Sequence, residues 1–127
     1  MTSSVSIAQS GLVAAMVKLN ASASNVANAD DTAAVGQAGA FQPTQVTNSP
    51  VPGGGVKARA TTVRPSQILA FDPTSPLANA QGLVETPEID PIAEVSNQLA
   101  ASHAFAFSLK VLQAANNDEE TLLNLKT

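Results

Sequence analysis

Few side chains in this sequence are of the types that carry out catalysis or bind metal ions. His103 is the single histidine, and the chain contains no cysteine. Because no acidic residue lies near His103 in sequence, we interpret it as a surface or interface residue, since catalytic and metal sites need convergent partners. Asp118, Glu119 and Glu120 are interpreted as a solvated charge cluster and not as a cation site. The sequence therefore predicts no enzyme, with no catalytic residue and no metal site.

Binding of phosphate, cofactor or nucleic acid is not predicted either. The segment "PGGG" (52–55) is not followed by the Lys-Ser/Thr pair of a phosphate loop. The one basic patch is Lys57, Arg59 and Arg64, and the chain has 6 basic against 10 acidic residues, for a net charge of −4. Without an aromatic platform beside the patch, an acidic protein partner is favoured over nucleic acid. We expect no cofactor, no nucleic acid and no small-molecule substrate.

Composition describes a single domain with a thin core. Of the 127 residues 44% are hydrophobic, but 23 are alanine, and Leu, Ile, Val and Phe together number 31. No apolar run is long enough to span a bilayer. The first positive side chain is Lys18, so the N-terminus lacks the features of a cleaved secretory signal.

Proline divides the chain into three parts. All eight prolines lie between Pro43 and Pro91, and because helices avoid interior proline, the two ends are the predicted helices. We expect an N-terminal helical part over 1–36, an extended or β-like insertion over 37–88 and a C-terminal helical part over 89–127. Within the insertion, strands are predicted at 56–64, 66–71 and 81–86, and residues 37–55 are predicted to be irregular, with a loop at 49–55.

The N-terminal part has the spacing of a packed helix, predicted from about residue 4 to 28. Large apolar residues recur every seven positions, with smaller steps of four and three between them; this stripe contains Val5, Leu12, Met16, Leu19, Ala23 and Val26. Gly11 is costly inside a helix, which suggests close approach of a neighbour. Ser22 lies off the stripe, where we expect exposure.

The C-terminal part opens with a clear helix start. Asp90 can cap, Pro91 suits the first helical position, and Glu94 suits the positive helix end. A second apolar stripe follows, containing Ile92, Val95, Leu99, Phe105, Ala106, Leu109 and Leu112. Asn116 and Asn117 are expected to kink or break this helix.

The small side chains favour packing between chains. Two Ala- and Ser-rich helices bury little apolar area by themselves, and that burial scarcely offsets the loss of chain entropy. Neighbouring helices from other subunits would supply the missing contacts. The alternative is a soluble two-helix protein-binding or chaperone-like module that folds alone or as a small dimer.

Two segments resemble the terminal signatures of bacterial flagellar rod and hook proteins. The first is "SGLVAAMVKLNASASNVANADD" (10–31), with its Asn-Val-Ala-Asn motif at 25–28, and the second is "GLVETPEIDPIAEVSNQLAASHAFAFSLKVL" (82–112). The short length and the stretch 56–84 are most similar to the proximal-rod members of the basal-body rod family. Leu83 and His103 depart from the usual Tyr and Arg of the family.

The resemblance implies a mainly α fold in which the terminal helices pack as an antiparallel coiled-coil pair around a small Pro/Gly-rich insertion. It implies a structural rod subunit, exported without a cleaved signal peptide, that polymerises helically in the periplasm as the torque-transmitting drive shaft and encloses the export channel. Expected partners are copies of itself, other rod subunits and the membrane-ring and export-gate proteins. The expected subunit-interface residues are Leu12, Met16, Leu19, Ala23, Asn25, Val26, Asn28, Ile92, Val95, Leu99, Phe105, Leu109 and Leu112.

Overall fold

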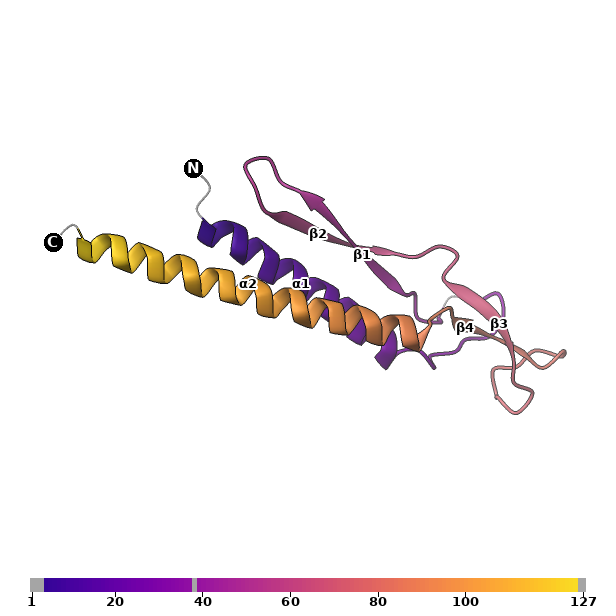
Figure 1. Ribbon diagram of the computed structural model, residues 1–127. Coiled ribbons are helices and arrows are strands. Elements are labelled where there is room, and N and C mark those ends of the chain that lie inside the picture. The colour runs from indigo at the N-terminus through magenta and orange to yellow at the C-terminus, as the bar shows by residue number, and fades with distance from the viewer. Residues whose placement is uncertain (1–3, 38, 126–127) are drawn as a thin grey trace.

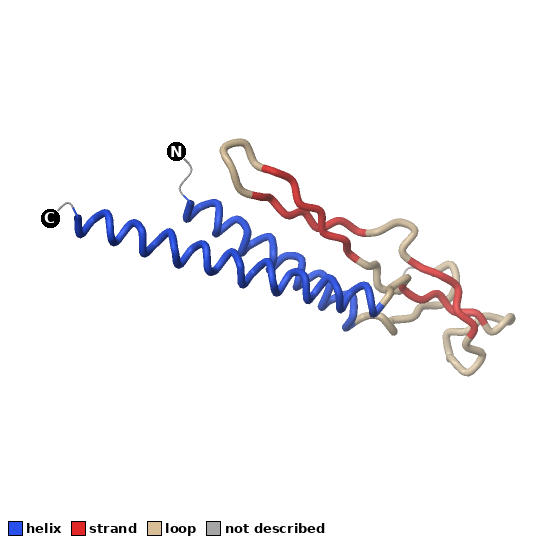
Figure 2. The backbone as a smooth tube through the Cα atoms, in the orientation of Figure 1, coloured by secondary structure: helices blue, strands red, loops and turns tan. Residues whose placement is uncertain are grey.

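The computed structural model describes residues 4–37 and 39–125 and shows an elongated molecule with the helices at one end (Figure 1). Helix α1 (Ser4–Ala27) and helix α2 (Pro91–Leu125) lie side by side and run in opposite directions. Strands β1 (Thr44–Pro50) and β2 (Val56–Thr62) form a ribbon along α1, and β3 (Gln67–Phe71) and β4 (Leu83–Pro87) form a second pair beyond the helix ends (Figure 2). The expected two terminal helices with a β-like insertion are therefore observed.

Both helix ends at the loop side of the molecule are capped by side chains that the sequence singled out. Asp90 Oδ1 accepts hydrogen bonds from the backbone N–H groups of Ile92 and Ala93 at 2.9 and 3.3 Å, just before Pro91 opens α2. At the end of α1, Asn28 Nδ2 donates to the Ser24 carbonyl at 2.8 Å. The Asp90 bonds satisfy N–H groups that the helix start leaves without a partner, and the Asn28 side chain adds a second donor to a carbonyl that also accepts the Asn28 backbone N–H at 3.1 Å.

The expected break at Asn116 and Asn117 is wrong, because α2 continues unbroken to Leu125. Asparagine costs only a few tenths of a kcal/mol relative to alanine or leucine in a helix, far less than proline. The next turn is also tied back, since Thr121 Oγ1 donates to the Asn117 carbonyl at 2.8 Å. Two asparagines therefore do not end a helix that has good helix formers on both sides.

The helices contact each other through small side chains. A Cβ atom built on Gly11 would lie 2.5 Å from Ser108 Oγ, so the two backbones approach as closely as the sequence suggested at Gly11. Ala15 and Ala101 are buried here. Ser22 is also buried, with 3% of its surface exposed, and its Oγ donates to the Glu94 carbonyl at 2.9 Å. The expectation that Ser22 is exposed is wrong, because the surface of α1 that meets α2 is the one with the smallest side chains.

The ribbon corrects the expectation of an irregular segment at 37–55. Strand β1 pairs antiparallel with β2, in a register that runs from Thr44 opposite Thr62 to Pro50 opposite Val56. The predicted loop at 49–55 is therefore shorter, because Ser49 and Pro50 belong to β1. Pro50 sits at the end of an exposed strand, a position where the ladder does not need its missing N–H.

The strand pair β3–β4 holds the only large apolar side chain that is almost completely buried among the described residues. Val84 is 1% exposed, and β3 pairs with β4 from Gln67 opposite Pro87 to Phe71 opposite Leu83. The segment after α1 joins this pair through two backbone hydrogen bonds between Ala33 and Glu85, each 2.9 Å long. The core is therefore small and lies partly outside the helix pair.

The tip of the ribbon is docked on the first half of α1. Val56 N–H donates to Ser10 Oγ at 3.0 Å, and Ser10 Oγ donates to the Ile7 carbonyl at 2.7 Å. Gly55 has a φ of +93°, and a Cβ built on it would lie 2.6 Å from Ser10 Oγ. Glycine is thus needed here both for its backbone conformation and for its lack of a side chain.

We expect Gly55→Ala to lower the thermal unfolding midpoint more than Gly36→Ala. Both glycines have positive φ, but nothing lies within 4 Å of a Cβ built on Gly36. Gly36→Ala should show the conformational penalty of about 1–2 kcal/mol alone, whereas Gly55→Ala also disturbs the Ser10 hydrogen bonds, at about 1 kcal/mol more. Melting curves followed by circular dichroism should separate the variants by about 4 °C; equal midpoints would contradict docking of the tip.

The turn after β3 contains a carboxylate, Asp72, whose pKa is lowered by its hydrogen bonds. The side-chain and backbone hydrogen bonds from Thr74 hold the pKa of Asp72 below its ordinary value. A depressed carboxyl pKa contributes stability above the unfolded pKa that is lost as pH falls through the folded pKa. We expect Thr74→Val to raise the pKa of Asp72 toward its ordinary value in an NMR titration, and an unchanged pKa would rule out the hydroxyl as its main cause.

Candidate assembly surface

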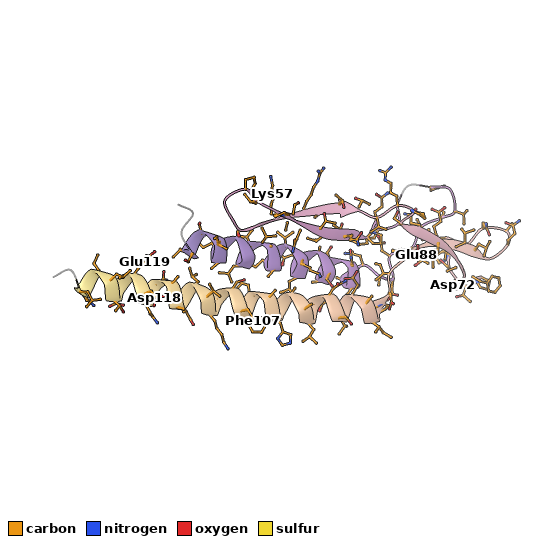
Figure 3. All side chains as sticks on the ribbon, turned by 45° about the horizontal axis from the view of Figure 1, so that its top comes forward. Lys57, Asp72, Glu88, Phe107, Asp118 and Glu119 are labelled. Atoms are coloured by element: carbon orange, nitrogen blue, oxygen red, sulfur yellow. The ribbon has the colours of Figure 1, made fainter. Side chains whose placement is uncertain are left out.

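Most of the large apolar side chains of the helices are exposed to solvent and not buried. The hydrophobic residues that are buried are alanines apart from one valine, namely Ala8, Ala14, Ala15, Ala33, Ala40, Val84 and Ala101. Figure 3 shows side chains projecting from the sides of both helices along their whole described length. A monomer rarely exposes large apolar patches unless they bind something, so the helix surfaces are the candidate functional site.

The residues expected at subunit interfaces are distributed along both helices. On α1, Met16, Leu19 and Val26 are 51, 38 and 40% exposed. On α2, Ile92, Val95 and Leu99 are 79, 60 and 60% exposed, and Phe105 and Leu109 are 37 and 38% exposed. Of the other residues expected at subunit interfaces, Ala23 is exposed and Leu12, Asn28 and Leu112 are half-buried.

Helix α1 therefore carries two stripes with a spacing of seven, and the sequence pattern drew attention to only one. Ala8, Ala15 and Ser22 recur every seven residues and are buried, while the large apolar stripe lies beside them on the flank. Small side chains let two helix backbones approach closely, and the bulky residues are left outside that contact. The signal that could have identified the buried stripe is Gly11, which lies on it and touches Ser108.

Asn25 joins three elements within the chain. Its Nδ2 donates to the Thr44 carbonyl at 2.9 Å and to Glu94 Oε1 at 2.8 Å, and its Oδ1 accepts the Thr44 N–H at 2.9 Å. Only 2% of its surface is exposed. Asn25, which is also expected at a subunit interface, fixes the end of α1 to the start of β1 and to α2.

An open groove of about 310 Å³ lies beside Asn25, between α1, the start of β1 and the start of α2. Lys18, Glu88, Asp90 and Glu94 are among its lining residues, so its charge is mixed. Within residues 4–37 and 39–125, no group of three or more His, Asp or Glu side chains is placed to hold a metal ion. His103 is exposed on α2, away from this groove.

The basic patch lies on the outer face of the ribbon. Lys57 and Arg59 pair opposite Ser49 and Thr47, two residues apart on the same face of β2, and both are exposed. Arg64 follows the end of β2 and is also exposed. Neither described helix has the length and apolar character of a membrane span.

Comparisons with known proteins agree on one class. Residues 80–125 match the family model described as the flagellar basal body rod FlgEFG protein C-terminal. The chain is similar to the flagellar basal-body rod protein FlgC of Buchnera aphidicola subsp. Acyrthosiphon pisum, with 36% identity over 122 residues that cover 87% of each chain. It is 34% identical over 116 residues to FlgC of Salmonella typhimurium, again with 87% of each chain covered. With FlgC of Bacillus subtilis the identity is 28% over 132 residues, covering 87% of this chain and 88% of that protein.

Proposed function

Since the chain belongs to the FlgC family of flagellar basal-body rod proteins, we propose that it is a proximal-rod subunit that polymerises helically into the drive shaft and encloses the export channel. The main support for this proposal is the pattern of burial in the helix pair. Small residues are buried between the helices, and large apolar residues are exposed on their flanks. Such a molecule gains most of its hydrophobic stabilisation only when other helices cover those flanks.

The helix pair is suited to this role. In the proposal α1 and α2 form an antiparallel coiled-coil pair, with 1–36 and 89–127 as the rod core and 37–88 as the insertion. Contacts that do not close on themselves generate helical assemblies, and two dissimilar flanks on one elongated molecule favour such head-to-tail contacts. The subunit-interface residues are then the exposed or half-exposed members of the set, from Leu12, Met16, Leu19, Ala23, Val26 and Asn28 on α1 to Ile92, Val95, Leu99, Phe105, Leu109 and Leu112 on α2.

The proposed partners rest on the exposed helix flanks and on membership of the rod family. Copies of this chain and other rod subunits would cover the helix flanks, and membrane-ring and export-gate proteins would meet the base of the rod. The proposed location is the periplasmic rod of the basal body, reached by export without a cleaved signal peptide. No catalytic residue or cofactor has a part in this function.

Imaging of isolated basal bodies tests the proposal. We expect a gene deletion to remove rod, hook and filament, and an epitope inserted in the exposed turn 73–76 to be seen at the rod by immunogold labelling. That turn lies at the end of the molecule away from the helices (Figure 1). A deletion strain that still builds complete rods would contradict the proposal, as would a functional tagged protein found only as a soluble monomer.

A further inference from the structure

Strand β3 has an open edge. On the other side of the pair, the backbone N–H and C=O of Glu85 bond to Ala33, each at 2.9 Å, so these groups of β4 point away from β3. In an antiparallel pair, residues that lie opposite each other either both bond across the pair or both point outward. Leu69 lies opposite Glu85, and Phe71 is two residues on, so the N–H and C=O groups of both point outward. No hydrogen bond within residues 4–37 and 39–125 satisfies these groups.

The open edge of β3 is apolar and unprotected. Leu69 and Phe71 are 57 and 72% exposed, and Ile68 is 47% exposed. Among the described helices and strands β3 contacts only β4, and in Figure 1 it lies beyond the ends of the helices. Proteins usually protect a free edge with lysine, proline or a covering segment, and the sequence "QILAF" of β3 contains neither residue. Such an edge is suited to receive a strand from another chain.

A second open edge lies on the ribbon, along the second half of β2. At the start of this edge, Val56 N–H donates to Ser10 Oγ at 3.0 Å, so Val56 points away from β1, and by alternation Ala60 and Thr62 do the same. Residues 59–62 are exposed, whereas Val56 is half-buried. Within the described part of the chain, no hydrogen bond satisfies the outward groups of Ala60 and Thr62.

We propose that the open edge of β3 in one copy pairs antiparallel with the second half of β2 in a second copy. Phe71 lies opposite Ala60 and Leu69 opposite Thr62, so that the outward N–H and C=O groups of the two strands bond to each other. Because β2 and β3 are different strands, each copy keeps one open edge for the next copy, and the contact can repeat without closing. This inference rests on the proposed function and adds to it a backbone contact between subunits.

The side chains favour a second copy of this chain as the partner. The register places Asp72 opposite Arg59, a pair of opposite charges, and Ile68 opposite Val63, which are 47 and 36% exposed. Asp72 accepts the Thr74 hydrogen bonds through Oδ1 alone, so its other carboxylate oxygen remains for the guanidinium group. Among the described residues, Arg59 has no ionic or hydrogen-bonding side-chain partner.

Neighbouring registers fit less well. Because outward groups recur every second residue, β3 can shift along β2 only by two residues at a time. One shift places Phe71 opposite Ala58, which is half-buried, and the other places Asp72 opposite Thr61, which offers no cation. The side chains and the exposed length of β2 therefore favour one alignment.

Cysteine pairing tests the contact directly, because the chain has no cysteine of its own. The register places Thr61 opposite Ala70 in a non-hydrogen-bonded pair, with Cα atoms about 4.5 Å apart, which a disulfide can span. Isolated basal bodies that contain Thr61→Cys/Ala70→Cys should give a ladder of cross-linked multimers on a non-reducing gel after mild oxidation. A disulfide within one chain leaves a monomer on the gel, so only a contact between copies gives the ladder.

The matched control is Lys57→Cys/Ala70→Cys. Lys57 lies on the same face of β2 as Thr61, but four residues away, which is about 13 Å along the strand. We expect no ladder from this variant, and none from Thr61→Cys or Ala70→Cys alone. A ladder of equal strength from the control would contradict the register.

A proline substitution provides the second arm. Ala60→Pro removes an outward N–H that the ladder with β1 does not use, so the subunit should keep its circular dichroism spectrum. The ring lies in the path of the incoming strand, and we expect the fraction of cells with hooks to fall by at least about tenfold. Asn48→Pro makes the same change at an exposed outward position of β1, which the contact does not use, and should assemble normally.

The outcomes separate this inference from the proposed function. Wild-type protein absent from basal bodies overturns the proposed function and this inference with it. Protein present in basal bodies, but with no ladder from Thr61→Cys/Ala70→Cys, overturns the strand contact and leaves the rod assignment standing. Loss of hooks in Ala60→Pro cells without a ladder means that the edge of β2 receives a different protein, which also overturns the inference, as do wild-type numbers of hooks in Ala60→Pro cells.

Discussion

Cells whose only copy of the protein carries Leu99→Asp are expected to make normal amounts of it and to build no rod, hook or filament. Leu99 is 60% exposed in the structure, so the change costs the isolated subunit little. In the proposed assembly a neighbouring helix covers this side chain, and burying an unpaired carboxylate costs several kcal/mol. Each 1.4 kcal/mol is a factor of about ten in an association constant, and every subunit of the rod carries the change.

The control for Leu99→Asp must add the same charge at a position outside the apolar flanks. Thr47→Asp does this, because Thr47 is exposed on β1, opposite Arg59 and away from both helices' large apolar residues. We expect Thr47→Asp cells to swim, and both variants to keep wild-type helicity in circular dichroism. Rods of normal length in Leu99→Asp cells, or equal loss of rods in Thr47→Asp cells, would rule out the flank as an assembly surface.

Asn25→Asp is expected to destabilise the folded subunit by at least about 3 kcal/mol. The substitution removes the donor to the Thr44 carbonyl and to Glu94 Oε1. It also places a second carboxylate beside that of Glu94, at a position where only 2% of the residue's surface is exposed. Denaturant unfolding of the purified chain measures the loss as a lower midpoint with an unchanged slope.

Two further variants test whether the loss of stability comes from the hydrogen bonds that join Asn25 to Thr44 and Glu94. Asn28→Asp makes the same chemical change at a half-buried position, where only the bond to the Ser24 carbonyl is lost, so its cost should stay near 1 kcal/mol or below. Asn25→Asp/Glu94→Gln removes the like charge and supplies a donor, so it should recover part of the loss. If Asn28→Asp costs as much stability as Asn25→Asp, the contacts of Asn25 with Thr44 and Glu94 do not stabilise the subunit more than an ordinary helix-end hydrogen bond does.

The start of α2 was predictable because its signals are local. Asp90 and Pro91 specify where α2 begins through backbone groups within a few residues. Strand β1 was missed because "TQVTNSP" has a single large apolar residue, Val46, and ends in proline. Its pairing with β2 and its bonds to Asn25 stabilise it as a strand, and neither partner is visible in the segment itself.

The orientation of α1 was the less predictable part of the candidate site. Sequence periodicity finds large apolar residues such as Leu19, and burial of the largest side chains is the usual result of folding. Here Ala15 and Ser22 are buried and Leu19 is 38% exposed, because close approach at Gly11 leaves room only for small groups. A pattern drawn from residue size therefore located the exposed flank of α1 and not the contact of α1 with α2.

The alanine core has a consequence for how temperature acts on this protein. Unfolding raises the heat capacity in proportion to the apolar surface it exposes, and the buried hydrophobic residues of the described chain are alanines and one valine. The heat capacity change of the isolated subunit should therefore fall below the usual value of about 12–15 cal/mol/K per residue. In the proposed assembly, covering the leucines and phenylalanines would carry a large negative heat capacity change instead. Because hydrophobic stabilisation weakens on cooling, the contacts between subunits should loosen in the cold while each subunit stays folded.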